Sequence, residues 1–394
     1  MKWLLYAIVL LLFPISVFAS SGVRVIDAEA ALKEREGLNL SRYATSIKYI
    51  PLETGLIYLP EAADISLYVR DGEYYLVSRN DANGTGCYKY GNDGAFVSTF
   101  IRRGRGPGEW TYLVDSDMDY NSGNIVVADA YNKVLVYGKE GGYLHSVPLP
   151  GYIKFPRVLY AGPDSLLISV DNMQESKGEM YVVGKDGILK EMSGAIENIY
   201  VRMDTSMGFR GQVFCRWVMF DYGGEGYIIS QATDTVYSVS GDFKKHARYF
   251  LDFGKFRDES AYEDCHSGEG INILPEGSRF GNSRFFCLRL LIPVDMDERL
   301  SLNERMIPFI YDVASNKAYA PKSKGDTMLN GFTNDLDGGA PFWPHVIYED
   351  RMYQLVDAID FIEAAQESDS AGMKRVAAQL TEDSNPVLIE VTLK

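Results

Sequence analysis

The sequence is poor in cysteine. Four cysteines occur among 394 residues, and no two of them form a C-x-x-C pair. This scarcity argues against a structural zinc site and against a small disulfide-stapled scaffold. The four residues, Cys87, Cys215, Cys265 and Cys287, are expected mostly as buried small apolar side chains, although export would permit disulfides in three possible pairings.

Histidines and catalytic motifs are scarce too. The four histidines, His145, His246, His266 and His345, are scattered along the chain without the spacing of metal ligands. The chain contains no G-x-S-x-G elbow, and residues 104–108 are not embedded in the βαβ unit of a dinucleotide site. The sequence therefore predicts no metal, no cofactor and no catalytic residue.

Positive charge is in the minority. Lysine and arginine total 39 against 54 aspartates and glutamates, which gives a net charge of −15 at pH 7. Nucleic-acid-binding proteins carry a basic surface for phosphate contacts, so we expect no nucleic-acid partner.

A long apolar run occurs at the start of the chain. Lys2 precedes an apolar stretch from Leu4 to Phe18, and Ala19 supplies a small residue before Ser20. This pattern is typical of a cleaved secretory signal peptide over residues 1–19. The alternative, a membrane anchor, would need about 20 apolar residues, and Pro14 interrupts the run.

The expected mature protein has no transmembrane segment. A bacterial lipoprotein would need a cysteine directly after the cleavage site, and the first cysteine is Cys87. We therefore predict export to the periplasm or the cell exterior without a lipid anchor. Residues 20–44 are expected to form an N-terminal segment ahead of one large domain over residues 45–394.

A repeat organises that domain. Four β-rich runs each end in a glycine-containing turn, and the glycines at 94, 141, 187 and 241 are spaced by 47, 46 and 54 residues. The turn glycines supply the positive φ that tight hairpins need. Another apolar run precedes each hairpin: Tyr74–Val77, Ile125–Ala128, Leu166–Ser169 and Tyr227–Ser230.

Repeats of this length with several strands each predict a β-propeller, because helical periodicity is absent from the runs. Residues 285–316 indicate a fifth unit, and residues 345–356 begin a sixth whose next strand is 386–393. The sixth unit is one strand short, and residues 47–52 could complete it. The predicted fold is an all-β, six-bladed propeller closed by its N-terminal strand.

Two insertions interrupt the repeat. Residues 252–284 are rich in charge, glycine and serine, and we expect a long loop. Residues 357–383 have helical spacing, with one face predicted to hold Ile359, Ile362 and Glu363. A second run, with Met373, Val376, Ala377 and Leu380 at helical spacing, follows Gly372 in this short helical insertion of the last blade.

Several short motifs in a fixed order carry a family resemblance. They are Tyr49–Thr54, Gly104–Trp110, Asp234–Tyr237, Leu251–Gly254, Asn334–Gly339 with Phe342–Pro344, and Asn385–Leu388. With them the chain resembles the secreted six-bladed β-propeller proteins common in Bacteroidetes, which are related in architecture to NHL-repeat propellers. The resemblance covers residues 45–394 and implies the fold and export. Many such relatives are lipoproteins, whereas this chain lacks the acceptor cysteine, and the resemblance implies no settled biochemical role.

The loop after the first hairpin unit is the strongest ligand-binding candidate. It combines Arg102, Arg103 and Arg105 with Glu109 and Trp110. Arginine can bind carboxylate, sulfate or phosphate through two parallel hydrogen bonds, and an exposed tryptophan could stack on a sugar or a base. The structural alternative is a rigid connector between blades with Arg–Glu pairs and a packed tryptophan.

Two acidic clusters are candidate cation sites. Asn334, Asp335 and Asp337 precede a Gly-Gly pair and resemble half of a calcium loop, but the distant glutamate ligand is missing. Asp115, Asp117 and Asp119 alternate, so they would share one face of a strand. Turn-forming or solvated carboxylates are the usual occupants of such positions, and we favour that interpretation.

These observations favour an exported module that binds a glycan, a peptide or a protein partner on one face of the ring. A propeller enzyme of the lactonase, lyase or glycosidase type is the alternative, because ligands from different blades can meet at a central channel. A structural role in an envelope complex is a third hypothesis.

Overall fold

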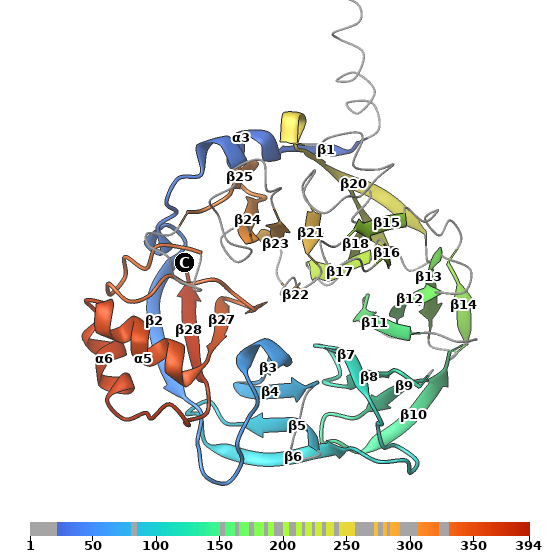
Figure 1. The fold of residues 1–394 in the computed structure, drawn as a ribbon, viewed down its shortest axis with the longest axis horizontal. Coiled ribbons are helices and arrows are strands. Elements are labelled where there is room, and N and C mark those ends of the chain that lie inside the picture. Colours follow the sequence, from blue (N-terminus) through green and yellow to red (C-terminus); the bar gives the residue numbers. More distant parts are fainter. Residues whose placement is uncertain are drawn as a thin grey trace, which may run out of the picture.

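The computed structural model places the strands in a ring of small sheets (Figure 1). The residues that it describes are 22–79, 85–131, 133–149, 154–161, 165–172, 177–184, 188–192, 200–204, 210–214, 217–222, 225–230, 234–239, 244–256, 272–274, 279–281, 284–291, 306–322 and 331–394. Cys215, Cys265, His266 and the signal-peptide prediction for residues 1–19 lie outside these ranges.

Six sheets in this part of the chain form the blades. Blade one holds β3 (Ile65–Arg70), β4 (Glu73–Ser78), β5 (Thr85–Tyr90) and β6 (Phe96–Arg102). Blade two holds β7 (Leu113–Met118), β8 (Ile125–Asp129), β9 (Lys133–Tyr137) and β10 (Tyr143–Pro148). Blade three holds β11 (Lys154–Tyr160), β12 (Leu166–Asn172), β13 (Lys177–Val183) and β14 (Leu189–Glu191).

The other three blades have additional or longer-range strands. Blade four holds β17 (Trp217–Tyr222), β18 (Glu225–Ser230), β19 (Thr235–Val239), β20 (Lys245–Asp252) and β1 (Arg24–Asp27). Blade five holds β21 (Asn272–Leu274), β23 (Phe285–Leu291), β24 (Met306–Asp312) and β25 (Lys317–Tyr319). Blade six holds β22 (Arg279–Gly281), β26 (Val346–Tyr348), β27 (Arg351–Val356), β28 (Val387–Leu393) and β2 (Ala44–Pro51). The strands β15 (Tyr200–Asp204) and β16 (Arg210–Phe214) pair with each other as a separate two-stranded sheet.

The core lies between the blades. The middle strands are nearly continuous apolar runs, as in the fully buried β8, because each sheet packs on a neighbour on both faces. Six apolar clusters each join two neighbouring blades; in the cluster between blades six and one, for example, Leu355 and Leu388 pack with Leu76 and Tyr88. The ring is therefore stabilised by burial between sheets and not by one central core.

Two of the predicted turn glycines also explain how the blades approach each other. Gly94 and Gly141 have φ values of +84° and +81°, as expected for these hairpins. A Cβ atom at Gly141 would collide with the Phe100 side chain on blade one, and a Cβ atom at Gly94 would collide with the backbone carbonyl of Pro51. The turns at 187 and 241 lie outside the described residues.

The ring closes as predicted. β2 pairs antiparallel with β28, with Tyr49 opposite Ile389 and Ile50 opposite Leu388. The outermost strand of blade six thus comes from the N-terminal part of the chain, while the neighbouring strand ends at Leu393. This pairing confirms the all-β, six-bladed propeller and leaves no open seam between the first and last blades.

The segment before β2 forms an additional strap. β1 pairs in parallel with β20, with Arg24 opposite Tyr249, and α3 (Ala28–Glu34) follows directly. Asp27 caps α3 by accepting a hydrogen bond from the Ala30 amide at 2.8 Å. Ile26 and Leu32 of this strap are buried in the cluster between blades four and five.

The helical insertion is confirmed, but the predicted face of its first helix is wrong. α5 (Ala358–Glu367) and α6 (Ala371–Ala377) lie between β27 and β28, over blade six (Figure 1). Ile359 is 44% exposed, whereas Phe361 is fully buried with its ring centroid 5.5 Å from that of Tyr49. The buried face follows Phe361 because the larger aromatic side chain removes more apolar surface from water.

The long loop insertion contains two short strands that the sequence did not predict. β21 pairs with β23 in blade five, and β22 pairs in parallel with β26 as an inner strand of blade six. Three-residue strands show no alternation that could be recognised. Residues 257–271 of this insertion lie outside the described ranges.

Candidate functional site

The predicted arginine loop is the connector from the outermost strand of blade one to the innermost strand of blade two. Its backbone folds back on itself: the Gly104 amide donates to the Trp110 carbonyl at 2.8 Å, and the Trp110 amide donates to the Arg102 carbonyl at 3.3 Å. The Glu109 amide donates to the Gly106 carbonyl at 3.1 Å and closes the tip. Gly108 has a φ of +72°, which glycine adopts without strain.

Glu109 stabilises this loop from within. Its carboxylate accepts a hydrogen bond from the Gly106 amide at 2.7 Å and fills the space that a Cβ at Gly104 would occupy. Its backbone carbonyl accepts a hydrogen bond from the Lys133 ammonium at 2.9 Å. Glu109 therefore fixes the loop through the Gly106 amide, whereas the connector interpretation expected it to pair with an arginine.

Trp110 is an anchor and not a surface ring, so the expectation that it stacks on a ligand is corrected. Its side chain is 2% exposed and lies in the apolar cluster between blades one and two. The indole packs so closely on Gly86 that no Cβ would fit there. An aromatic side chain of this size is buried wherever neighbouring blades leave room, because its burial is strongly favourable.

The three arginines are exposed, and the side chains of two of them have no polar partner among the described residues. The Arg103 Nε donates to the Thr111 carbonyl at 3.3 Å, and its guanidinium carbon lies 5.8 Å from the centroid of the Trp110 ring. Arg102 and Arg105 form neither an ion pair nor a side-chain hydrogen bond within the described part of the chain. The Arg–Glu pairs of the connector interpretation are therefore not formed there.

A buried carboxylate brings two further residues to this loop. Asp129, at the end of β8, is fully buried and accepts hydrogen bonds from the Thr111 amide at 2.7 Å and the Tyr112 amide at 3.4 Å. It also accepts one from the Tyr131 amide at 3.0 Å. The side chains of Tyr112 and Tyr131 are 54% and 69% exposed, respectively.

We define the connector surface as Arg102, Arg103, Arg105, Tyr112 and Tyr131. Sequence reasoning missed both tyrosines because they are separated by 19 positions. Only the fold brings their backbones together, through Asp129 and through the hydrogen bond from the Ala130 amide to the Tyr112 carbonyl at 2.9 Å. The signal available in the sequence was an aspartate at the end of an apolar run with a tyrosine two positions later. The surface presents cationic and aromatic side chains on a backbone whose amides are already hydrogen-bonded.

The alternating aspartates serve the backbone and do not share one site. Asp115 accepts from the Val158 amide at 2.9 Å, and Asp117 accepts from the Tyr160 amide at 2.7 Å, so β7 is tied to the innermost strand of blade three. Asp119 lies beyond β7, where it accepts from the Asn121 amide at 3.0 Å. The expectation that all three carboxylates lie on one strand face is therefore wrong.

In the second acidic cluster, Asn334, Asp335 and Asp337, the two carboxylates contact different parts of the protein. Asp335 accepts hydrogen bonds from the amide and the hydroxyl of Ser41, at 2.8 and 2.5 Å. Asp337 accepts from the Tyr49 hydroxyl at 3.2 Å and from the Asn334 amide nitrogen at 2.9 Å. Among the described residues, no group of three or more His, Cys, Asp or Glu side chains is arranged to hold a metal ion.

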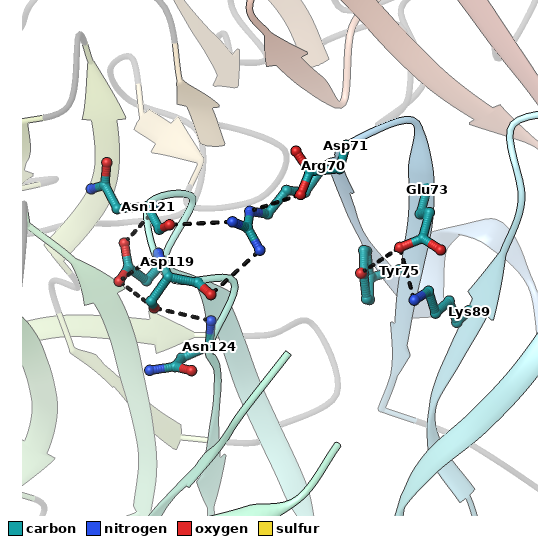
Figure 2. A network of polar contacts seen from close by, with 9 residues as sticks. Arg70, Asp71, Glu73, Tyr75, Lys89, Asp119, Asn121 and Asn124 are labelled. Carbon is teal, nitrogen blue, oxygen red and sulfur yellow. Dashed lines mark hydrogen bonds and ion pairs between the residues drawn. The ribbon is translucent and has the colours of Figure 1, made fainter. Parts of the chain in front are cut away.

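At the opposite end of β7, unlike at the connector surface, two cationic side chains bind partners within the protein. Figure 2 shows Arg70 reaching from blade one to the turn after β7, where it donates to the carbonyls of Asn121 and Ser122 at 3.2 and 3.3 Å. In the same view, the Lys89 ammonium lies 2.8 Å from the carboxylate of Glu73. The cations at this end are thus engaged within the protein.

His345 is the histidine with the most distinctive environment. Its Nδ1 accepts a hydrogen bond from the Leu355 amide at 3.3 Å, which requires the neutral ring. Burial, aided by the positive charge of Arg289, lowers the pKa of His345 to about 4. His145 and His246 are exposed on β10 and β20.

The free thiols of Cys87 and Cys287 are buried, as the sequence predicted for most cysteines. Burial raises the pKa of both thiols well above the ordinary range. Such thiols are unreactive at neutral pH, so they act as small apolar side chains in the packing between strands.

The fold defines a six-bladed β-propeller. The chain belongs to the family described as Domain of unknown function (DUF4934), whose model matches residues 23–392. No curated protein matches the chain. Within the described residues, no helix has the length and apolar character needed to cross a membrane.

The solved structures that resemble this chain include the following two. One is a protein of Bacteroides fragilis NCTC 9343 that is inferred to be exported; its TM-score is 0.60 at 14% identity, over 95% of this chain and 99% of that one. At this identity the likeness shows the fold alone. The other, a streptogramin B lyase, has a TM-score of 0.38 at 10% identity, over 73% of this chain and 90% of that one, and supports no inference about this protein.

Proposed function

We propose that this protein is an exported, non-catalytic binding module that holds a glycan, peptide or protein partner at the connector surface. The observation that carries the proposal is the pair of exposed guanidinium groups, Arg102 and Arg105, without a protein partner in the described part of the chain. They stand on a loop fixed by Glu109, Trp110 and Asp129. Because the backbone that carries these cations is already fixed, an anionic partner needs to order only the arginine side chains when it binds.

Export is supported by two observations. Residues 1–19 have the pattern of a secretory signal peptide, and the similar Bacteroides fragilis structure is of a protein inferred to be exported. We propose a periplasmic or extracellular location without a lipid anchor. Fractionation of cells that express the full chain should recover a shortened product outside the cytoplasm, whereas a full-length product in the cytoplasm would contradict export.

The binding proposal predicts a specific loss on substitution. Residues 20–394 of the natural chain should be screened against immobilised glycans, peptides and envelope proteins. The double variant Arg102→Gln with Arg105→Gln should be screened in the same way, and the affinities for each partner compared. We expect the variant to bind its partner about tenfold more weakly, because two charge-assisted contacts are removed. Thermal unfolding should be unchanged, since both side chains are exposed and form no hydrogen bond or ion pair within the described residues.

The matched control removes two exposed cations from elsewhere. Lys374 and Arg375 lie in the last turn of α6, and their change to glutamine lowers the net charge equally. This control should bind as the natural chain does. Partners whose affinities are unaffected by the Arg102 and Arg105 changes, or equally affected by the control, would contradict the proposed surface.

A further inference from the structure

We propose that the partner of the connector surface is an acidic glycan, meaning a sugar chain that carries carboxylate or sulfate groups; this rests on the proposed function. The inference depends on three properties of the surface. They are its local charge, the state of its backbone amides and its two exposed phenol rings.

Local charge decides whether an anionic ligand can approach a chain of net charge −15. At physiological ionic strength, charges farther than about 8 Å apart are largely screened, so the nearest side chains dominate. Three arginines stand within four positions here, and the carboxylates of Glu109 and Asp129, which contact this connector, each accept hydrogen bonds from backbone amides. The connector surface is therefore a cationic spot on an otherwise acidic protein.

The backbone of the connector argues against a peptide that binds by strand addition. Six amides are already used within the protein, those of Gly104, Gly106, Glu109, Trp110, Thr111 and Tyr112. Strand addition draws its affinity from free main-chain donors and acceptors. Recognition at this surface must therefore come mainly from side chains.

The two tyrosines favour a sugar over other anions. Tyr112 and Tyr131 are more than half exposed, although their backbone positions are fixed by Asp129. Exposed phenol rings have an apolar face for the C–H face of a sugar and a hydroxyl for its polar edge. The guanidinium groups of the same connector, of which Arg103 reaches the Thr111 carbonyl next to Tyr112, would hold carboxylate or sulfate oxygens through paired hydrogen bonds. This combination matches a charged sugar residue better than a simple inorganic anion.

The experiment compares four defined probes: polygalacturonate for carboxylates, dextran sulfate for sulfates, neutral dextran and poly-L-glutamate. Binding of residues 20–394 should be measured with the natural chain, the Arg102→Gln and Arg105→Gln variant, and a Tyr112→Ala and Tyr131→Ala variant. We expect at least one charged polysaccharide to bind, with affinity falling about tenfold in each variant. Neutral dextran should not bind, and a rise in salt from about 0.05 to about 0.5 M should weaken the interaction.

A conservative variant separates stacking from misfolding. Tyr112→Phe with Tyr131→Phe keeps both rings, so it should retain most of the affinity that the alanine variant loses. Preference for polygalacturonate or for dextran sulfate identifies the charged group. All variants should unfold at the temperature of the natural chain.

The outcomes distinguish this inference from the proposed function. Equal binding of poly-L-glutamate, with no effect of the tyrosine changes, would overturn the glycan class while leaving a binding module intact. Failure of both charged polysaccharides would overturn it as well. If the broader screen finds no partner whose binding depends on Arg102 and Arg105, the proposed function itself would be overturned.

Discussion

At the residue scale, buried and half-buried carboxylates organise the loops of this protein. Asp129, Glu109, Asp115 and Asp117 all accept hydrogen bonds from backbone amides. A carboxylate that replaces water for several amides prevents those donors from being buried without a partner. These acidic side chains thus stabilise the backbone of the loops. Within the described residues, none of them forms an ion pair with Arg102 or Arg105.

Asp129 gives the sharpest residue-scale prediction. Asp129→Ala removes the acceptor of the Thr111, Tyr112 and Tyr131 amides, so we expect a loss of roughly 3 kcal/mol in the free energy of unfolding. Denaturant unfolding measures this loss. Asp93→Ala is the control, because Asp93 serves one exposed turn amide and should lose far less. Equal losses in both variants would contradict the role of Asp129.

His345 predicts a pH dependence of stability. Its pKa in the folded protein is about 4, below the value of about 6.5 for an unperturbed histidine, so the unfolded chain binds a proton first as the pH falls. The free energy of unfolding should therefore decrease between pH 6.5 and pH 4, by up to about 3 kcal/mol from this group. His345→Gln should flatten that decrease, and an unchanged pH profile in the variant would contradict it.

At the element scale, contacts between a hairpin and the neighbouring blade determine which residues are allowed. Gly141 in the turn before β10 lies against Phe100 of blade one, whereas Gly72 in the turn between β3 and β4 has no atom within 4 Å of a built Cβ. Both have positive φ values, +81° and +76°. Replacing either glycine would therefore strain the backbone at positive φ. Only a side chain at Gly141 would also disturb the contact between blades.

This pair yields a matched stability prediction. Gly72→Ala should lower the free energy of unfolding by about 1 kcal/mol, because alanine is disfavoured at positive φ. Gly141→Ala should lower it by roughly 1–3 kcal/mol more, because Phe100 or a strand must move. Chemical denaturation measures both. Equal losses would show that the blades are not in close contact at this turn.

The elements also show where sequence reasoning succeeds. The hairpins around Gly94 and Gly141 were predictable because turn chemistry and apolar runs are local signals. β1, β21 and β22 were missed because strands of three or four residues carry no measurable alternation, and two of them pair in parallel with distant segments. The exposed Ile359 was misplaced because tertiary packing of Phe361 selected the buried face of α5.

At the scale of the whole molecule, the ring was predictable and its ligand surface was only partly so. The repeat spacing and the missing strand of the sixth unit predicted the closure that β2 and β28 form. Exposure of Arg102, Arg103 and Arg105 followed from their loop. Burial of Trp110 did not, because it depends on Gly86 and Ile101 of blade one. The attachment of the Tyr112 and Tyr131 backbones to the same carboxylate, that of Asp129, could not be predicted either.

The affinity ratio between the natural chain and the Arg102→Gln and Arg105→Gln variant tests the central claim most directly. It should be measured with a charged polysaccharide, beside the Lys374→Gln and Arg375→Gln control of equal net charge. We predict about tenfold weaker binding for the connector variant and unchanged binding for the control, at equal thermal stability. Equal dissociation constants for all three proteins would contradict the connector surface as the binding site.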